Sequence, residues 1–201
     1  MTTWHAVAAK AASLLLRYPD QAVLATMPTL RAALRGLPEP VATPLIGLAE
    51  HYAATPPDRL AQSYVDTFDF RRRCCLHLTY YTHGDTRARG GALAAFVTAY
   101  RSAGLAVDGG ELPDYLPAIL DLAATAGEPG WRLLREHRVG LDLLHDALSR
   151  DGSAWRRAVD AVLRLLPPAG PRELAAAARL AAAGPPAERV GLAGYALGGG
   201  R

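Results

Sequence analysis

The residues best suited to chemistry lie close together in one segment, YVDTFDFRRRCCLHLTYYTHGDTRARG, which covers residues 64–90. It contains two adjacent cysteines, two histidines, three consecutive arginines, several acids and several aromatic rings. Such residues can bind a metal, activate a thiol, bind nucleic acid or form a docking surface for another protein. Their spacing, and the elements that carry them, distinguish these four uses.

A metal site would require Cys74, Cys75, His77 and His83 to converge on one point. Zinc ligands usually follow spacings such as C-x(2–4)-C and H-x(3–5)-H. Two adjacent side chains on a helix point about 100° apart, so the adjacent cysteines do not fit this pattern. We therefore expect no metal site and no cofactor held by this chain.

Catalysis by a thiol is the second use. His77 follows Cys74 by three residues, and the neighbouring arginines would lower the pKa of a thiol. The sequence shows no third orienting residue, no oxyanion-hole glycine motif and no phosphate-binding glycine loop. Asp69 and Arg73 are four residues apart and predict an ordinary ion pair on a helix face. We expect no catalytic residue and no enzyme, and a thiol enzyme stays open as a third hypothesis.

Binding of nucleic acid is the alternative function. The net charge is only +3, and Asp66, Asp69 and Asp85 partly neutralise the run Arg71–Arg73. No segment has the pattern of a recognition helix. An all-helical nucleic-acid-binding regulator is therefore kept as the alternative, although we expect no nucleic acid among the partners.

The elements that carry these residues are predicted to be helices throughout. Half of the 201 residues are hydrophobic and only 7% are aromatic, so alanine and leucine supply most of the apolar content. Both favour helix, and no alternating β-branched run predicts a strand. We predict an all-α fold, a single-domain antiparallel helical bundle over residues 1–183, and a glycine-rich mobile tail over residues 184–201.

Prolines and glycines divide this domain into helical blocks joined by short loops. The predicted helices cover residues 3–18, 20–34, 44–54, 58–83, 85–102, 111–127, 129–149, 153–166 and 171–183. Pro28 is expected to kink or split the second helix, and Pro113 to lie in the first turn of the sixth. Gly90 and Gly91 predict a close contact between their helix and another one.

The two cysteines are neighbours, so they cannot staple a loop, and a disulfide-dependent secreted fold is not expected. The first residues predict an amphipathic helix with no basic region before it, unlike a signal peptide. No apolar run approaches the roughly 18 to 20 residues of a membrane span. We expect a cytoplasmic protein with no stable membrane insertion.

The docking surface is the fourth use. In the helix predicted over residues 58–83, Leu60, Tyr64 and Phe68 share one face, and Cys75, Leu78 and Tyr81 extend the stripe beyond a bend near Phe70. We predict aromatic anchors and orienting charges, the mixture that interfaces favour. The anchors are Tyr64, Phe68, Tyr80 and Tyr81, and the charges are Asp69, Asp85, Arg72 and Arg87. The alternative is that the rings form core and the charges pair within the chain.

Three segments carry a resemblance to a known family. Residues 64–90 closely resemble the signature region of NarJ-type nitrate reductase molybdenum cofactor assembly chaperones. ELPDYLPAILDLAA, residues 111–124, resembles the second signature block of that family, and SLLLRYPD, residues 13–20, resembles its opening helix. The resemblance covers about residues 4–150 in the same order, and it implies the all-helical fold of redox-enzyme maturation chaperones.

The resemblance also implies a function. Such a chaperone is a non-catalytic cytoplasmic helper that binds the catalytic (alpha) subunit of respiratory nitrate reductase, including its N-terminal segment. It supports insertion of the molybdenum cofactor and assembly before the enzyme docks at the membrane. Proteins that deliver the molybdenum cofactor are expected as further partners.

The second signature block adds candidate residues for client binding. In the wider group, a Pro-Asp-His stretch helps to form the peptide site, and the matching residues here are Pro113, Asp114 and Tyr115, preceded by Glu111. Tyr115 departs from the usual histidine, which argues against a histidine-based pH switch at this position. The prediction as a whole requires that a foreign chain can reach the aromatic stripe.

Overall fold

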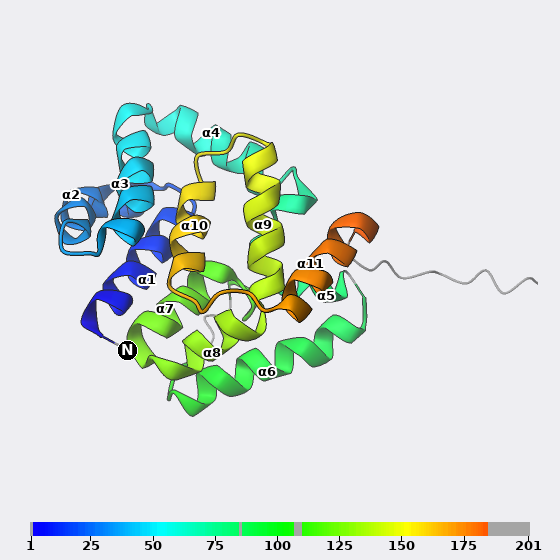
Figure 1. Ribbon diagram of the computed structural model, residues 1–201. Helices are drawn as coiled ribbons and strands as arrows, with labels where there is room; N and C mark the ends of the chain where they lie inside the picture. The colour runs from blue at the N-terminus through cyan, green and yellow to red at the C-terminus, as the bar shows by residue number, and fades with distance from the viewer. Residues whose placement is uncertain (1, 85, 107–109, 185–201) are drawn as a thin grey trace, which may run out of the picture.

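The computed structural model describes residues 2–84, 86–106 and 110–184, and every regular element in these ranges is a helix. The predicted all-α bundle is therefore confirmed. The elements are α1 (Thr3–Leu16), α2 (Gln21–Leu34), α3 (Glu39–Ala54), α4 (Pro57–Phe68), the 3₁₀ helix η1 (Arg72–Cys74), α5 (Tyr80–His83), α6 (Ala88–Ser102), α7 (Leu116–Ala126), α8 (Glu128–Glu136), α9 (Arg138–Arg150), α10 (Arg156–Arg164) and α11 (Pro171–Ala183) (Figure 1). None of the described helices is long and apolar enough to cross a membrane.

Helix α1 is central to the bundle and packs along α7, with further contacts to α10, α2 and α3. Ala8, Ala9 and Ala12 are completely buried on it, and such small side chains allow neighbouring helices to approach closely. Ser13 Oγ donates a hydrogen bond to the Pro117 carbonyl oxygen (2.8 Å), which ties α1 to the first turn of α7. The position of α7, which carries part of the candidate site, is thus set by α1.

A chain of hydrogen bonds around Trp155 joins α10, α3 and α1. The Trp155 indole Nε1 donates to Tyr52 Oη (3.1 Å), and Tyr52 Oη donates to the Leu15 carbonyl oxygen (2.9 Å). Both rings are buried, so their polar atoms require such partners. The rings of Tyr64 and Phe68 on α4 pack against Trp155 with centroid distances of 5.6 and 5.5 Å. This cluster holds α4 against the rest of the bundle.

The segment after α4 differs most from the prediction. The expected continuous helix over residues 58–83 is wrong over residues 69–79, which hold only the short helix η1 and a stretch that pairs with another segment, whereas Tyr80–His83 form α5. Leu78 N donates to the Asp114 carbonyl oxygen (3.1 Å), and Leu116 N donates to the Leu76 carbonyl oxygen (2.8 Å). An antiparallel bridge therefore joins His77 to Tyr115, and this tertiary pairing takes backbone groups that a helix would have used.

Several other helix boundaries also differ from the prediction. Pro28 lies inside a continuous α2 rather than dividing it, and the helix expected over residues 129–149 is split at His137 into α8 and α9. Pro113 precedes α7 instead of lying in its first turn. Side chains added at Gly90 and Gly91 would meet open space, so the predicted close helix contact there is wrong.

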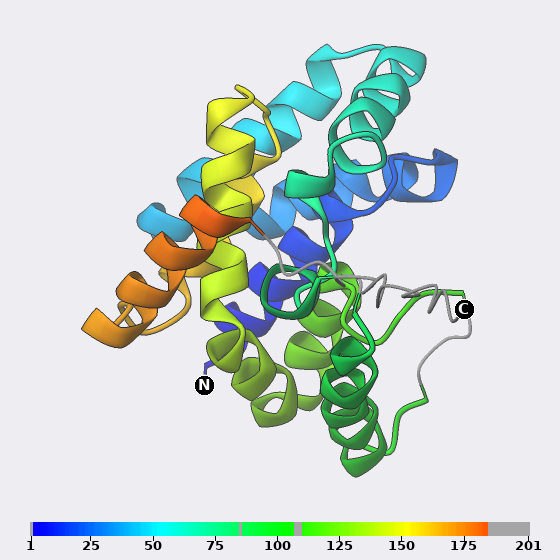
Figure 2. The ribbon, with the colours of Figure 1, turned by 90° about the vertical axis from the view of Figure 1, so that its right-hand side faces the viewer.

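Helix α11 lies on the outside of the bundle, along α9 (Figure 2). It packs mainly against α9, none of its residues is buried, and its bounds equal the predicted range 171–183. Gly170 N donates to Glu173 Oε2 (2.5 Å), which caps its first turn. Of the tail predicted over residues 184–201, all but Gly184 lies outside the described residues.

Candidate functional site

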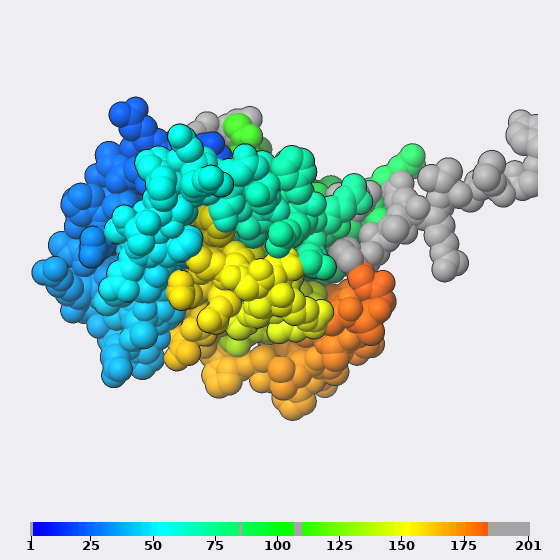
Figure 3. All heavy atoms as spheres, turned by 90° about the horizontal axis from the view of Figure 1, so that it is seen from above, coloured from blue at the N-terminus to red at the C-terminus, as the bar shows by residue number. Residues whose placement is uncertain are grey.

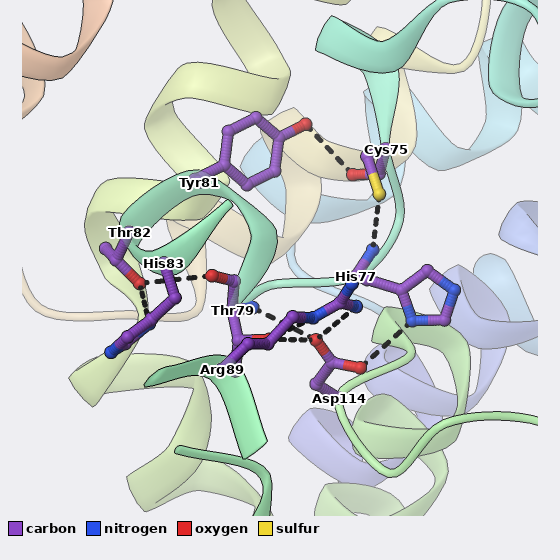
Figure 4. A network of polar contacts seen from close by, with 8 residues as sticks. All are labelled: Cys75, His77, Thr79, Tyr81, Thr82, His83, Arg89 and Asp114. Carbon is purple, nitrogen blue, oxygen red and sulfur yellow. Dashed lines mark hydrogen bonds and ion pairs between the residues drawn. The ribbon is translucent and has the colours of Figure 1, made fainter. Parts of the chain in front are cut away.

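Asp114 is the centre of a buried polar network that joins residues 77–89 to the start of α7 (Figure 4). Its Oδ2 accepts hydrogen bonds from Thr79 N (3.2 Å), Thr79 Oγ1 (2.5 Å) and Arg89 Nη2 (3.3 Å). Its Oδ1 accepts one from His77 Nδ1 (3.0 Å). Arg89 Nε also donates to Thr79 Oγ1 (3.0 Å), so the network is closed on itself.

The electrostatics of this network keep Asp114 ionised. Burial alone would raise the pKa of its carboxyl, but the hydrogen bonds from His77 and Thr79 and the charges of His77 and Arg89 hold the pKa at about 2. A buried carboxylate is tolerated only with partners of this kind. Asp114 is fully buried and Pro113 is buried too, so neither side chain faces solvent. Any effect of Asp114 on a client would act through the segment that it holds in place.

Tyr115, the next residue, lies half-buried between α4 and the paired segment. Its hydroxyl lies 3.4 Å from the Tyr64 hydroxyl, which donates to the Leu16 carbonyl oxygen (3.0 Å). Its ring lies against the His77 ring, with a centroid distance of 5.5 Å. A histidine that the sequence suggested only for metal or thiol chemistry therefore lies next to Tyr115.

A cleft of about 380 Å³ opens beside Tyr115, lined also by Glu111, Tyr18 and other residues at the end of α1 and the start of α2. A larger groove of about 680 Å³ continues from it between α1 and α2, because Leu14 and Thr26 line both hollows. Alanine, valine, leucine and threonine side chains form most of the walls of this groove. The two hollows offer apolar surface next to the most polar part of the site.

Three segments that are far apart in the sequence meet here, because two of them line the cleft and the third contacts their tyrosines through the buried Tyr64. Leu14 and Tyr18 come from residues 13–20, Tyr64 from residues 64–90 and Tyr115 from residues 111–124. The Tyr18 and Tyr64 rings are in contact, with a centroid distance of 5.6 Å. The three segments on which the family resemblance depends therefore build one place in the fold.

The chain also matches a known protein family. Residues 34–160 match the model of the family described as "Nitrate reductase delta subunit". The chain belongs to the nitrate reductase delta subunit family. This finding, together with the similarity to proteins named NarJ, confirms the resemblance to NarJ-type chaperones.

Three relatives show how far the similarity extends. The chain is 41% identical over 162 residues to "Nitrate reductase-like protein NarX" of Mycobacterium tuberculosis, which covers 80% of this chain but 24% of that protein. It is 30% identical over 174 residues to "Probable nitrate reductase molybdenum cofactor assembly chaperone NarJ" of Bacillus subtilis, covering 86% and 95% of the two chains. It is 36% identical over 116 residues to the NarJ chaperone of Escherichia coli K12, covering 56% and 49%. The chain thus spans about a quarter of NarX and nearly all of the Bacillus protein.

The other aromatic residues predicted to bind a client lie mainly in the interior of the protein. Tyr64, Tyr80 and Tyr81 are buried, whereas Phe68 is half-buried. Tyr81 Oη donates to the carbonyl oxygens of Arg73 (3.0 Å) and Cys75 (2.9 Å), which holds the turn after η1. The rings are therefore mostly core, although Tyr64 contacts Tyr115 at the edge of one cleft and Tyr81 lines a small hollow of about 200 Å³ beside α9 and α11. Their part in client binding stays a prediction.

The predicted charged residues are distributed differently. Asp69, Arg72, Arg87 and Glu111 are exposed, and of these Glu111 lines the cleft beside Tyr115. Asp85 lies outside the described residues. Their role at a client interface also stays a prediction.

The expected ion pair between Asp69 and Arg73 is wrong. Because the chain leaves the helix after Phe68, the two residues no longer share a helical face. Arg73 Nη2 instead lies 2.5 Å from Asp151 Oδ1, and Arg71 Nη1 lies 3.1 Å from Asp151 Oδ2. Two of the three consecutive arginines thus bind an acid at the end of α9, which does not favour the alternative of a nucleic-acid-binding surface.

Cys74 and His77, which a thiol enzyme would bring together, have different partners. Cys74 Sγ donates to Asp151 Oδ2 (3.4 Å), while His77 binds Asp114. Burial and the contact with Asp151 raise the pKa of the Cys74 thiol to about 12, and they outweigh the arginines that were expected to lower it. The thiol is therefore protonated at neutral pH. Among the described residues, no three His, Cys, Asp or Glu side chains gather as metal ligands.

Sequence reasoning missed Thr79, Arg89 and Trp155 as parts of this region. Thr79 and Arg89 lie within the first signature segment, but their common partner is a carboxylate at residue 114. Trp155 lies in the part of the chain where the resemblance ends. Tyr18 carried a signal that could have been used, because it lies in the segment that resembles the opening helix of the family.

Proposed function

We propose that this chain is an assembly chaperone for a respiratory nitrate reductase. It binds the catalytic subunit, including its N-terminal segment, and supports insertion of the molybdenum cofactor before the enzyme docks at the membrane. The names of the Bacillus and Escherichia relatives support this role. A non-catalytic function, a cytoplasmic location and contact with proteins that deliver the cofactor belong to the same proposal.

The observation that supports client binding most is the continuous groove between α1 and α2. It combines about 680 Å³ of mainly apolar surface with the smaller cleft beside Tyr115. A groove of this kind can accept the apolar face of an amphipathic helix, whose anchors recur every three to four residues. Small side chains such as Ala6 and Ala25 leave room for larger side chains of the client.

Charges along the groove favour one orientation of the client. Asp20, Glu111 and Arg17 line the cleft beside Tyr115, but Arg17 Nη2 lies 2.6 Å from Asp121 Oδ2, so its charge is largely balanced. Lys10 lines the larger groove. Lys10 Nζ lies 2.9 Å from Asp121 Oδ1, so part of its charge is already balanced. We therefore assign the positively charged end of the client segment to the side of Glu111. Charges at the rim of a groove mainly set register and the rate of association.

Calorimetry with a peptide from the N-terminus of the cognate catalytic subunit tests this proposal. The expected dissociation constant is on the order of micromolar. The substitution Ala25→Trp fills the groove and is expected to weaken binding at least about tenfold, which corresponds to roughly 1.4 kcal/mol. Ala95→Trp is the matched control, because Ala95 is also an exposed helical alanine but does not line the groove.

Cells without this chain provide the second readout. Their nitrate reductase catalytic subunit is expected to contain little molybdenum, and the wild-type gene is expected to restore it. Normal molybdenum content in these cells, together with no heat from the cognate peptide, would exclude the chaperone role. An equal loss of peptide affinity in Ala25→Trp and Ala95→Trp would instead place the client elsewhere on the molecule.

A further inference from the structure

Helix α11 is attached to the bundle along one side only. Figure 3 shows α11 (orange) at the outer edge of the molecule, next to α9 (yellow). Its inner face consists of half-buried residues at the spacing of a single helix face, which are Glu173, Ala176, Ala177 and Leu180. All of its other residues are exposed, and none of its 13 residues is buried. The helix therefore removes little apolar surface from water when it docks.

No polar contact reinforces this packing. Within the part of the chain that the structure describes, no side chain of α11 forms an ion pair or a hydrogen bond with another helix. The nearest tie lies before the helix, where Arg138 Nη1 donates to the Pro167 carbonyl oxygen. By contrast, α1 is tied to α7 through Ser13, and α10 is tied to α3 through Trp155. Because the linker is anchored at Pro167 and the helix beyond it is not, α11 can swing away while the bundle stays folded.

The contact between α11 and α9 is also incomplete in shape. A hollow of about 200 Å³ remains between the two helices, and its walls include Leu143, Ala147, Leu180 and Ala181. Side chains that face a void lose the dispersion contacts that a close-packed neighbour would supply. A larger side chain at the position of Ala181 would fill this space and hold the helix more firmly.

The charges at the contact also oppose docking. Glu173 is the only charged residue on the inner face of α11. Burial raises the pKa of Asp142 on α9, and the charge of Glu173 raises it further, against the opposing charges of Arg138 and His145. A helix without an acid at the position of Glu173 would avoid this repulsion.

The surface beneath α11 has the composition of a helix-docking site. Leu143 and Ala147 on α9 and Tyr81 on α5 form its apolar floor, and Asp146 and Arg150 lie at its rim. We call these five residues the α9 seat. The two rim charges pair with each other at 3.2 Å, so the seat itself is nearly neutral. It shares no lining residue with the groove assigned to the client.

We propose that α11 is an autoinhibitory strap, and that the α9 seat is a docking site for an amphipathic helix of a partner protein. The strap occupies the seat until the partner helix replaces it. The seated α11 shows what the seat accepts, which is a helix with small and apolar residues on one face. The partner helix presents larger apolar side chains to the hollow and carries no acid at the position of Glu173. This inference goes beyond the proposed chaperone function and does not depend on it.

The strap controls the affinity for the partner by competition. Because α11 is tethered to the bundle, it competes at an effective concentration on the order of 1 mM. The apparent dissociation constant of the partner is its intrinsic value divided by the fraction of chains with an open seat. A substitution confined to α11 therefore changes the affinity for a helix that never touches the substituted residue.

Fluorescence anisotropy on the full chain tests the proposal with a labelled peptide. The peptide has the sequence of residues 170–184 with Glu173→Gln and Ala181→Leu, which remove the acid and fill the hollow. Saturable binding of one peptide per chain is expected. A peptide of the same composition in scrambled order is the control and is expected not to bind.

Substitutions in α11 of the full chain are expected to act in opposite directions. Leu180→Ala weakens the strap and should tighten peptide binding about fivefold, whereas Ala181→Leu strengthens the strap and should weaken binding about fivefold. Leu174→Ala is the matched control, because Leu174 lies on the same helix but is 58% exposed, and it should leave the affinity unchanged. All three positions lie on the outermost helix, so the bundle is expected to fold in each variant.

Hydrogen–deuterium exchange shows where the peptide binds. A peptide in the α9 seat releases α11, so the amides of residues 171–183 are expected to exchange faster when it is bound. Binding at any other surface would leave these amides unchanged or slow their exchange.

Four results would overturn the proposal. They are the absence of saturable binding, equal affinities in Leu180→Ala and Ala181→Leu, and exchange in α11 that the peptide leaves unchanged or slows. The fourth is dimerisation of the wild type at rising concentration that Leu180→Ala abolishes, because the seat would then accept α11 of a second copy. Sedimentation equilibrium measures this last outcome.

Discussion

His77 Nδ1 lies 3.0 Å from Asp114 Oδ1, and this contact joins two segments separated by more than thirty residues. The same two segments pair through their backbones at the His77–Tyr115 bridge. Asp114 is therefore first a structural residue, whose carboxylate positions the wall of the cleft beside Tyr115.

Asp114→Asn is expected to lower the free energy of unfolding by roughly 3 kcal/mol, because it replaces a charged acceptor by an amide among four donors. Urea denaturation followed by circular dichroism measures this loss. Asp160→Asn is the control, since Asp160 forms a partly exposed helical pair with Arg164 and should cost about 0.5 kcal/mol or less. An Asp114→Asn variant that is as stable as the wild type but no longer binds the client would make Asp114 a direct contact.

The pH dependence of stability follows from the same carboxyl group. Its pKa falls from an ordinary value of 3.8 to about 2 in the folded state, so the unfolded state binds more protons between these values. The resulting stabilisation, about 2 kcal/mol, is complete above pH 4 and is lost as the pH falls through about 2. Melting curves of wild type and Asp114→Asn should therefore differ by a constant amount above pH 4 and converge below it. A difference that grows on acidification would contradict the assignment.

Substitution of glycine by alanine is expected to change the stability of the protein in opposite directions at two positions. A Cβ atom at Gly130 would lie 2.2 Å from Ala123 N and 2.5 Å from Ala123 Cα, because α8 crosses α7 closely there. Gly130→Ala is expected to destabilise the protein by about 2 kcal/mol or more. Gly91→Ala, in α6, meets open space and should stabilise it by about 0.5–1 kcal/mol. Thermal melting measures both, and a neutral Gly130→Ala variant would show that the two helices can move apart without cost.

The two cysteines are expected to react at different rates. Cys74 is completely buried with its pKa raised to about 12, whereas Cys75 is partly exposed. Iodoacetamide at pH 8 should therefore modify Cys75 well before Cys74, because the thiolate is the reactive form. Mass spectrometry of the C74S and C75S variants assigns each rate. Faster reaction of Cys74 would mean that its contact with Asp151 opens readily in solution.

Most of the helices could be predicted from the sequence, because each one is marked by a local spacing of apolar residues. The stripe of Leu60, Tyr64 and Phe68 lies on α4 as expected, and α11 has the predicted bounds. The residues after Phe68 could not be predicted in this way. No proline or glycine interrupts residues 58–83, so the local pattern favoured helix, and the competing hydrogen bonds come from residues 114–116.

The sequence predicted some of the residues of the candidate site, but it did not predict how their side chains are arranged. The resemblance marked Tyr115 and Glu111, which line a cleft, but it could not show that Asp114 is buried. The burial of Asp114 depends on Thr79 and Arg89, whose side chains reach it only after the chain turns away from α4. Contacts at such sequence separations leave no local pattern, and they decide which charged residue faces solvent.

The pairing of residues 76–78 with residues 114–116 protects two backbone amides, whose hydrogen exchange can be measured. The amide protons of Leu78 and Leu116 are held by carbonyl oxygens of the opposite segment, and both side chains are completely buried. Hydrogen–deuterium exchange at these two amides therefore requires the cleft wall to separate from the start of α7. Their exchange rates measure how often the chain opens at this seam, independently of any ligand or partner.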